Sequence, residues 1–165
     1  VELKEKCRGL YNLGKHSLHM SDYSSDTYRI SSSLLNTNSI HFLNNGTNDI
    51  SESTKNLLKT YFENNVDEDY CLTSSLILEM YGLRKANDVD YLHKNDKKLE
   101  NFGLHSGVWL EYYKENKDDI IYNPSNYFYF NGLKFASLKV VKEMKNNRKE
   151  PKDINDLKLI SKISI

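Results

Sequence analysis

The chain has 165 residues, a length typical of one domain whose core needs no disulfide bonds. Hydrophobic residues make up 38%, which predicts a modest core, and twelve tyrosines and six phenylalanines enlarge it. The 23 basic and 23 acidic residues give a formal net charge of zero, which indicates neither a nucleic-acid-binding protein nor a polybasic membrane tail.

The first predicted elements lie in the N-terminal part of the chain. Residues 1–22 show no clear hydrophobic periodicity, whereas residues 24–36 have apolar residues at helical spacing after a serine that can cap a helix. Residues 38–44 alternate between polar and apolar side chains and are predicted to form a short strand. Residues 51–64 have an apolar stripe typical of a second helix.

The remaining elements alternate between strands and helices. Asn131-Gly132 between two runs of β-forming residues is a strong signal for a hairpin turn. Ser137 is predicted to cap the helix that follows the hairpin, and Pro151 fits the first position of a last helix. In chain order, the predicted elements are a strand at 70–74, a helix at 75–81 ended by Gly82, a strand at 89–92, a helix at 99–113, a strand at 120–122, hairpin strands at 127–130 and 133–136, and helices at 137–148 and 151–160.

This order predicts the α/β (α+β) class, with a mixed β-sheet flanked by helices, a β-hairpin and two C-terminal helices. We expect one domain over residues 1–165. Residues 1–37 would form an irregular and helical extension, and residues 38–165 would form the α/β core. The chain does not begin with methionine, and it is expected to be a piece of a longer protein.

The pattern that carries chemistry is Asp88-Val-Asp90 at the start of a predicted strand. Residues two apart on a strand project from the same face, so the two carboxylates are expected to lie side by side. Two carboxylates held this closely repel each other unless a proton or a metal ion lies between them. Mg²⁺ fits such a pair because it prefers oxygen ligands and bridges to phosphates.

A turn of two small residues, Ser74 and Ser75, comes before the short helix that precedes Asp88. Hydroxyl and backbone N–H groups at such a turn can bind phosphate. Together, the serine turn and the aspartates predict a site for a nucleoside triphosphate bound to a metal ion.

This arrangement resembles the nucleotidyltransferase superfamily, with its DNA polymerase beta-like fold, in which a turn of small residues precedes an Asp-x-Asp strand. The resemblance covers about residues 70–160 and is closest to the abortive-infection-type nucleotidyltransferase-like domains. The last two helices (LKVVKEMKNNRKEPKDINDL) resemble the closing pattern of that branch: a lysine, an arginine, then Lys-Asp and a second Asp. Ser74 stands where the family has glycine.

The resemblance implies a metal-dependent transfer of a nucleotidyl or related phosphoryl group to a small acceptor. Asp88 and Asp90 would bind Mg²⁺ (or Mn²⁺), and Asp119 is the candidate for the third carboxylate of active members. The substrate would be a nucleoside triphosphate. The acceptor would be a small molecule or a carbohydrate, as in surface-polysaccharide biosynthesis. The residues expected to contact the nucleotide are Ser74, Ser75, Arg84, Lys145 and Arg148.

Other readings of the sequence remain open. The chain can be a non-catalytic module of a larger synthase, a toxin-like nucleotidyltransferase, or a fragment of a glycosyltransferase that uses Asp-x-Asp. His16, His19 and Asp22 can form a metal cluster, although surface or structural roles are the simpler interpretation. Residues 9–15 (GLYNLGK) match a P-loop, but His16 replaces the Ser or Thr that binds magnesium.

The remaining sequence features concern the location of the protein. Cys7 and Cys71 lie far apart and outside any zinc-like spacing, which favours a reducing, cytoplasmic environment. No stretch approaches the roughly 20 apolar residues that a membrane span needs, and no signal peptide is visible. The expected partners are the nucleotide, its acceptor and other domains of a longer chain.

Overall fold

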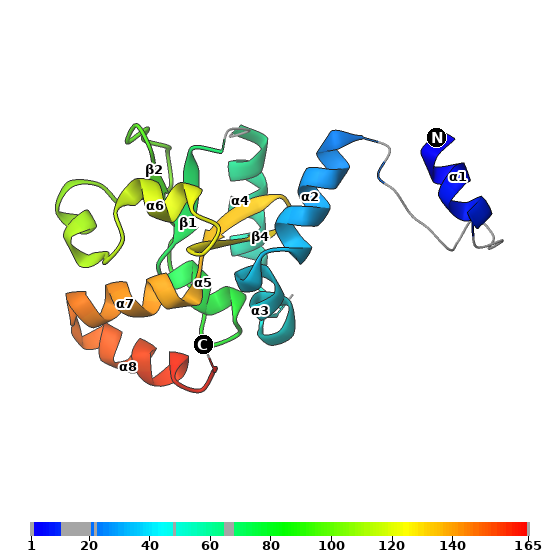
Figure 1. Ribbon diagram of the computed structural model, residues 1–165. Helices are drawn as coiled ribbons and strands as arrows, with labels where there is room; N and C mark the ends of the chain where they lie inside the picture. Colours follow the sequence, from blue (N-terminus) through cyan, green and yellow to red (C-terminus); the bar gives the residue numbers. More distant parts are fainter. Residues whose placement is uncertain (1, 11–20, 22, 48, 65–67, 165) are drawn as a thin grey trace.

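The computed structural model describes residues 2–10, 21, 23–47, 49–64 and 68–164. These residues form a mixed α/β fold in which helices flank a five-stranded sheet (Figure 1), so the predicted fold class is confirmed. The helices are α1 Glu2–Leu10, α2 Ser24–Leu34, α3 Thr37–Asn45, α4 Glu52–Asn64, α5 Ser75–Met80, the 3₁₀ helix Gly107–Tyr112, α6 Lys117–Tyr122, α7 Leu138–Arg148 and α8 Pro151–Ile160. The strands are β1 Tyr70–Thr73, β2 Asp90–His93, β3 Gly103–Leu104, β4 Tyr127–Phe130 and β5 Leu133–Ala136.

The sheet has the strand order β3-β2-β1-β5-β4, with β1 at its centre. All four residues of β1 are buried, as expected for a strand covered on both faces. β1 pairs antiparallel with β2, and Thr73 at the end of β1 lies opposite Asp90 at the start of β2. The residues that follow β1 and those that precede β2 therefore meet at one end of the strands.

The C-terminal helices lie at the same end of the strands. β5 runs parallel to β1, so its carboxyl end lies at this end of the sheet. Ser137 then connects β5 to α7. α7 packs against α5 and against α8, and the α7–α8 pair lies below this end of the sheet in Figure 1. α6 packs on β1 and β2, and α2 and α3 pack on β4.

Several local signals act as predicted. β4 and β5 pair as an antiparallel hairpin around Asn131-Gly132, where both turn residues have positive φ angles. The Ser137 side chain accepts a hydrogen bond from the Val140 N–H and caps α7. Pro151 occupies the first turn of α8. The last two predicted helices and the hairpin are therefore confirmed.

Two predicted strands are wrong. Residues 38–44 belong to α3, because the Asn36 side chain caps the helix by accepting from the Ser39 N–H. Their alternation is misleading: Phe42 is buried and stacks on Phe128, whereas Ile40 is exposed. Residues 120–122 belong to α6, which the Asn116 side chain caps in the same way.

The predicted helix at residues 99–113 is also wrong. This segment contains the edge strand β3, a turn and the 3₁₀ helix. Gly103 pairs with Asp90 of β2, and Gly107 has a φ of +55°, a conformation that interrupts an α-helix. The segment therefore extends the sheet beside the start of β2.

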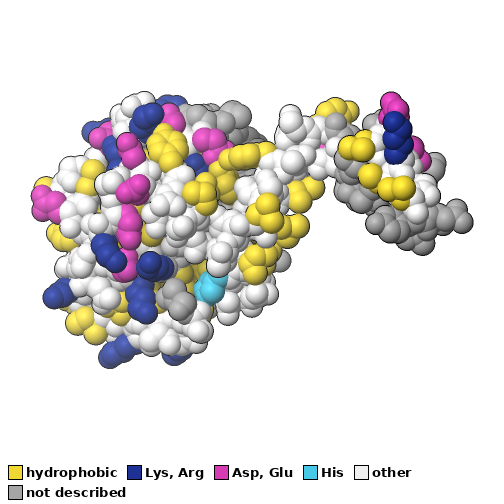
Figure 2. All heavy atoms as spheres, viewed as in Figure 1, with side chains coloured by type: hydrophobic (Ala, Val, Ile, Leu, Met, Phe, Trp, Pro, Cys, Tyr) yellow, Lys and Arg dark blue, Asp and Glu magenta, His cyan; other side chains and the backbone are white. Residues whose placement is uncertain are grey.

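α2, which lies in the predicted N-terminal extension, contacts β4. The Tyr28 hydroxyl of α2 and the Tyr129 hydroxyl of β4 form a hydrogen bond of 3.0 Å. Hydrophobic side chains remain exposed along α2 and α3 (Figure 2), including Tyr28, Leu34 and Leu43. Among the described residues, no helix is long and apolar enough to cross a membrane.

Candidate functional site

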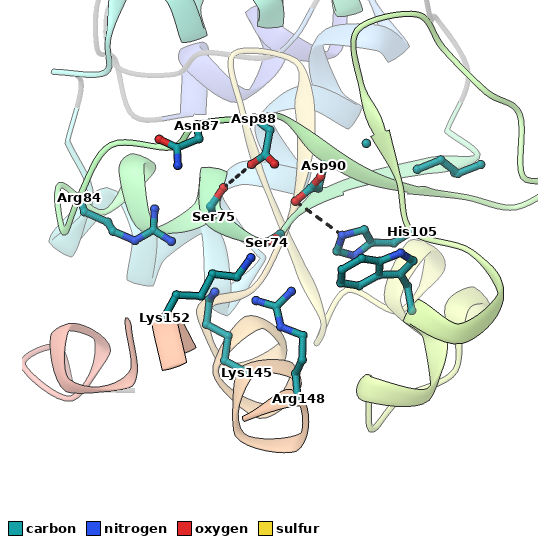
Figure 3. Close-up of a pocket in the computed structure, with 13 residues that line it drawn as sticks. Ser74, Ser75, Arg84, Asn87, Asp88, Asp90, His105, Lys145, Arg148 and Lys152 are labelled. Atoms are coloured by element: carbon teal, nitrogen blue, oxygen red, sulfur yellow. Dashed lines mark hydrogen bonds and ion pairs between the residues drawn. The ribbon is translucent and has the colours of Figure 1, made fainter. Parts of the chain in front are cut away.

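A cleft lies at the end of the sheet where β1 ends and β2 begins (Figure 3). Its walls come from the turn after β1, the start of β2, β3 and the two C-terminal helices. The residues that line it are Ser74, Ser75, Arg84, Asn87, Asp88, Asp90, Gly103, Leu104, His105, Trp109, Lys145, Arg148 and Lys152. The cleft thus contains seven of the eight site residues expected from the sequence.

Asp88 and Asp90 both line this cleft, although Asp90 is the first residue of β2 and Asp88 lies in a bend before the strand. Val89 between them is buried, so the two aspartates project from the opposite side of the chain (Figure 3). Ser75 Oγ donates a hydrogen bond of 3.0 Å to Asp88 Oδ1. Asp88 is exposed, whereas the Asp90 side chain is only 13% exposed, so the cleft has one outer and one inner carboxylate.

The inner carboxylate, Asp90, is held by polar neighbours. His105 Nε2 lies 3.5 Å from Asp90 Oδ2, and the Ser74 hydroxyl also bonds to this carboxylate. Burial raises the pKa of Asp90, but the contacts with His105 and Ser74 outweigh it and lower the pKa below its ordinary value. Asp90 is therefore ionised at neutral pH.

His105 is itself fixed on several sides. Its Nδ1 lies 2.7 Å from the Tyr113 hydroxyl, which is 3.1 Å from Thr73 Oγ1 at the end of β1. The Trp109 ring stacks on the imidazole with a centroid distance of 4.9 Å and an angle of 8°. Burial raises the pKa of Tyr113, so its hydroxyl stays neutral and can donate to the imidazole.

Ser74 has a backbone conformation that favours glycine. Its φ of 61° and ψ of −133° lie in a region that costs a residue with a side chain about 1–3 kcal/mol. The turn from β1 into α5 adopts this conformation. Ser74 keeps the turn and adds a hydroxyl that bonds to Asp90.

Four basic side chains line the cleft: Arg84, Lys145, Arg148 and Lys152. We call Arg84, Lys145 and Arg148 the cleft cations. Two buried carboxylates of α8, Asp153 and Asp156, hold all three. Arg84 Nε and Nη2 donate to Asp156 at 2.5 and 2.7 Å. Lys145 Nζ lies 3.2 Å from Asp153 and 2.7 Å from Asp156, and Arg148 donates to Asp153 at 2.9 and 2.6 Å.

The loop that carries Arg84 and Asp88 is fixed at its base by Glu79. The buried Glu79 carboxylate accepts hydrogen bonds from the backbone N–H groups of Ser51 and Ala86 and from the Thr54 hydroxyl. Burial raises the pKa of Glu79, and these donors more than compensate and lower it. Glu79 therefore holds the start of this loop in place through the backbone of Ala86.

The structure does not bring every candidate into the cleft. Asp119 lies exposed in the first turn of α6, where its carboxylate accepts from the Asn116 side chain, and it does not line the cleft. His16, His19 and Asp22 lie outside the described residues.

The donors available to a metal ion are the oxygens of Asp88 and Asp90. Within the described part of the chain, no group of three or more His, Cys, Asp or Glu side chains can hold a metal ion. Mg²⁺ is commonly bound by one or two carboxylates, with water and substrate phosphates completing its shell. The pair therefore fits a metal that arrives with a phosphorylated substrate.

Several residues of the cleft carry no recognisable signal in the sequence, chiefly Gly103, His105, Trp109, Asn87 and Lys152. His105 and Trp109 fall inside the predicted helix at residues 99–113, which does not mark either one as a site residue. A glycine beside a short apolar run could have indicated the edge strand β3. Nothing local to His105 indicates its contact with Asp90, because that contact depends on the pairing of β3 with β2.

Comparison with protein-family models, curated proteins and solved structures gives no match to this chain.

Proposed function

We propose that this domain is a metal-dependent nucleotidyltransferase that transfers a nucleotidyl or related phosphoryl group from a nucleoside triphosphate to a small acceptor. The observation that carries the proposal is the position of Asp88 and Asp90. They share one cleft with the serine turn that precedes them and with the cleft cations opposite. Carboxylates on one wall and cations on the other fit a metal-bound polyphosphate.

Asp88 and Asp90 would hold Mg²⁺ or Mn²⁺. The metal would neutralise phosphate charge and lower the pKa of the acceptor hydroxyl. The Ser75 hydroxyl orients the outer carboxylate, and His105 and Ser74 orient the inner one. The cleft cations would bind the non-transferred phosphates and offset the charge that develops on the leaving group.

The acceptor must give up a proton when its oxygen attacks phosphorus. Within the described cleft, the groups that can take it are the carboxylates of Asp88 and Asp90, because Nε2 of His105 carries a hydrogen toward Asp90 when Tyr113 donates to Nδ1. A carboxylate can serve as a general base when it lies within hydrogen-bond reach of the hydroxyl. The proposed acceptor is a small molecule or a carbohydrate. The resemblance and the zero net charge of the chain both favour it over a nucleic acid.

The direct test incubates the protein with each nucleoside triphosphate, Mg²⁺ or Mn²⁺, and a panel of sugar phosphates and sugar alcohols. Pyrophosphate release and the mass of the acceptor are measured together. The proposal predicts metal-dependent pyrophosphate release and an acceptor heavier by one nucleotidyl group. Neither product with any nucleotide, together with no metal-dependent nucleotide binding, would exclude it.

A nucleotide-binding module without transfer activity is the second candidate. The observation that favours it is the missing third carboxylate, since Asp119 lies outside the cleft and the described residues offer no substitute aspartate or glutamate there. Metal-dependent nucleotide binding without turnover would support this module. Turnover that depends on Asp88 would exclude it.

A further inference from the structure

We infer that the two α8 carboxylates, Asp153 and Asp156, are positioning residues that hold the cleft cations as a preformed cradle for polyphosphate. The inference rests on the proposed function for the identity of its ligand. Neither carboxylate lines the cleft itself. Any effect on the ligand must therefore pass through the cations that they bind.

The five charges form one continuous chain of alternating sign. Arg84 bonds to Asp156, Asp156 to Lys145, Lys145 to Asp153, and Asp153 to Arg148. Both arginines present two nitrogens to a single carboxylate, which fixes the plane of each guanidinium. The chain thus connects the loop before β2 with both C-terminal helices.

Burial makes the arrangement rigid. Asp153 is 0% exposed, Asp156 2% and Lys145 1%. Long basic side chains lose rotamer freedom when they bind a ligand, and cations already held in place avoid most of that cost. Two of the three Lys145 donors are used by the carboxylates, which leaves one for a ligand in the cleft that Lys145 lines.

Buried ion pairs are weak evidence for a role in stability alone. Replacement of such pairs by apolar residues is often neutral or stabilising, because removing charges from water is costly. Here the buried charges lie where α7 and α8 meet the cleft, and all three cations reach its wall. This position favours a role in ligand binding.

The inference predicts an effect opposite to that of simple electrostatics. Removing a negative charge near an anion site should strengthen anion binding, since the local potential becomes more positive. If Asp156 acts as a positioning residue, its removal should weaken binding, because Arg84 and Lys145 lose their common partner. The sign of the change in affinity therefore distinguishes the two.

The experiment titrates magnesium tripolyphosphate into the whole chain by calorimetry. Asp156→Asn is expected to weaken binding at least about tenfold, as misplaced binding groups commonly do. Equal or tighter binding would overturn the inference. The matched control is Glu143→Gln, which removes a charge from α7 at a site that does not line the cleft, and its affinity should stay within about twofold of wild type.

A second variant covers the case in which Asp156→Asn fails to fold. Arg84→Lys keeps the charge but loses the two-pronged contact with Asp156, and this side chain is 30% exposed, so folding is retained. The inference predicts about tenfold weaker binding for Arg84→Lys, and wild-type affinity would contradict it. In an Arg84→Gln background, Asp156→Asn should weaken tripolyphosphate binding by a smaller factor than it does in the wild-type protein. If the two losses of binding free energy are fully additive, Asp156 does not act through Arg84.

The outcomes separate this inference from the proposed function. Asp156-dependent binding of magnesium tripolyphosphate without nucleotidyl transfer would refute the proposed function and leave the cradle in place. Transfer with the same nucleotide KM in wild type and in Asp156→Asn would refute the cradle and leave the proposed function in place.

Discussion

Gly103 lies so close to Asp90 that a Cβ added to Gly103 would be 2.0 Å from Asp90 Oδ1. The pairing of β3 with β2 creates this contact, since Gly103 and Asp90 are register partners. A side chain at residue 103 must therefore displace the inner carboxylate of the cleft.

Gly103→Ala should accordingly impair the site while the fold survives, because the group that must move is the end of a side chain. We expect metal-dependent nucleotide binding to weaken about tenfold to a hundredfold. The thermal midpoint should fall by only a few degrees, which corresponds to about 1 kcal/mol. Calorimetry with Mg²⁺ and nucleotide and a thermal melt measure the two quantities.

Gly9→Ala is the control for this prediction, since no atom lies within 4 Å of the Cβ it would introduce. Its nucleotide affinity should equal that of wild type. If Gly103→Ala also binds at wild-type affinity, the position of Asp90 does not matter for binding.

Ser74→Gly is expected to stabilise the protein. The φ of 61° and ψ of −133° suit glycine, and relief of the strain should exceed the entropy cost of glycine, for a net gain of about 1 kcal/mol. Ser74→Ala keeps the strain and loses the hydroxyl, so it should be less stable than Ser74→Gly. Urea unfolding of the three proteins measures the order, and an alanine variant more stable than the glycine variant would contradict the account.

The pH dependence of stability should report the buried ion pairs. Burial raises the pKa of Asp153, but the hydrogen bonds and charges of Arg148 and Lys145 outweigh it and hold the pKa at about 2, against 3.8 without these contacts. A lowered pKa in the folded state contributes stability above pH 3.8, and this contribution disappears as the pH falls toward 2. The shift corresponds to about 2 kcal/mol.

The free energies of unfolding of wild type and Asp153→Asn should therefore converge by about 2 kcal/mol between pH 7 and pH 2. Urea unfolding at a series of pH values measures this difference. A difference that stays constant across the range would show that Asp153 is not ionised through the ion pairs described.

The sequence was most informative where a local signal determines the structure. The Asn131-Gly132 turn, the Ser137 cap and Pro151 each act through neighbouring residues, and the elements they predict are present. Asp88 and Asp90 also reach one cleft, although Asp88 lies in a bend before β2 and strand alternation alone does not place it there.

The sequence was least informative where tertiary contacts determine the structure. Residues 38–44 look like a strand by alternation, yet the Asn36 cap and the packing of Phe42 on β4 make them helical. His105 reaches Asp90 only because β3 pairs with β2, and no local pattern indicates that pairing. The ion-pair chain on α8 likewise depends on how two helices pack.

The most direct measurement compares Asp88→Asn and Asp90→Asn with wild type for Mg²⁺-dependent nucleotide binding and turnover, with Asp119→Asn as the matched control outside the cleft. Loss of a metal ligand should cost about 2–3 kcal/mol, or about a hundredfold in rate, in each of the two cleft variants. Asp119→Asn should keep wild-type turnover, because Asp119 is exposed on α6 and does not line the cleft. Turnover that survives both cleft substitutions, or that is lost only in Asp119→Asn, would contradict the assignment of the chemistry to this cleft.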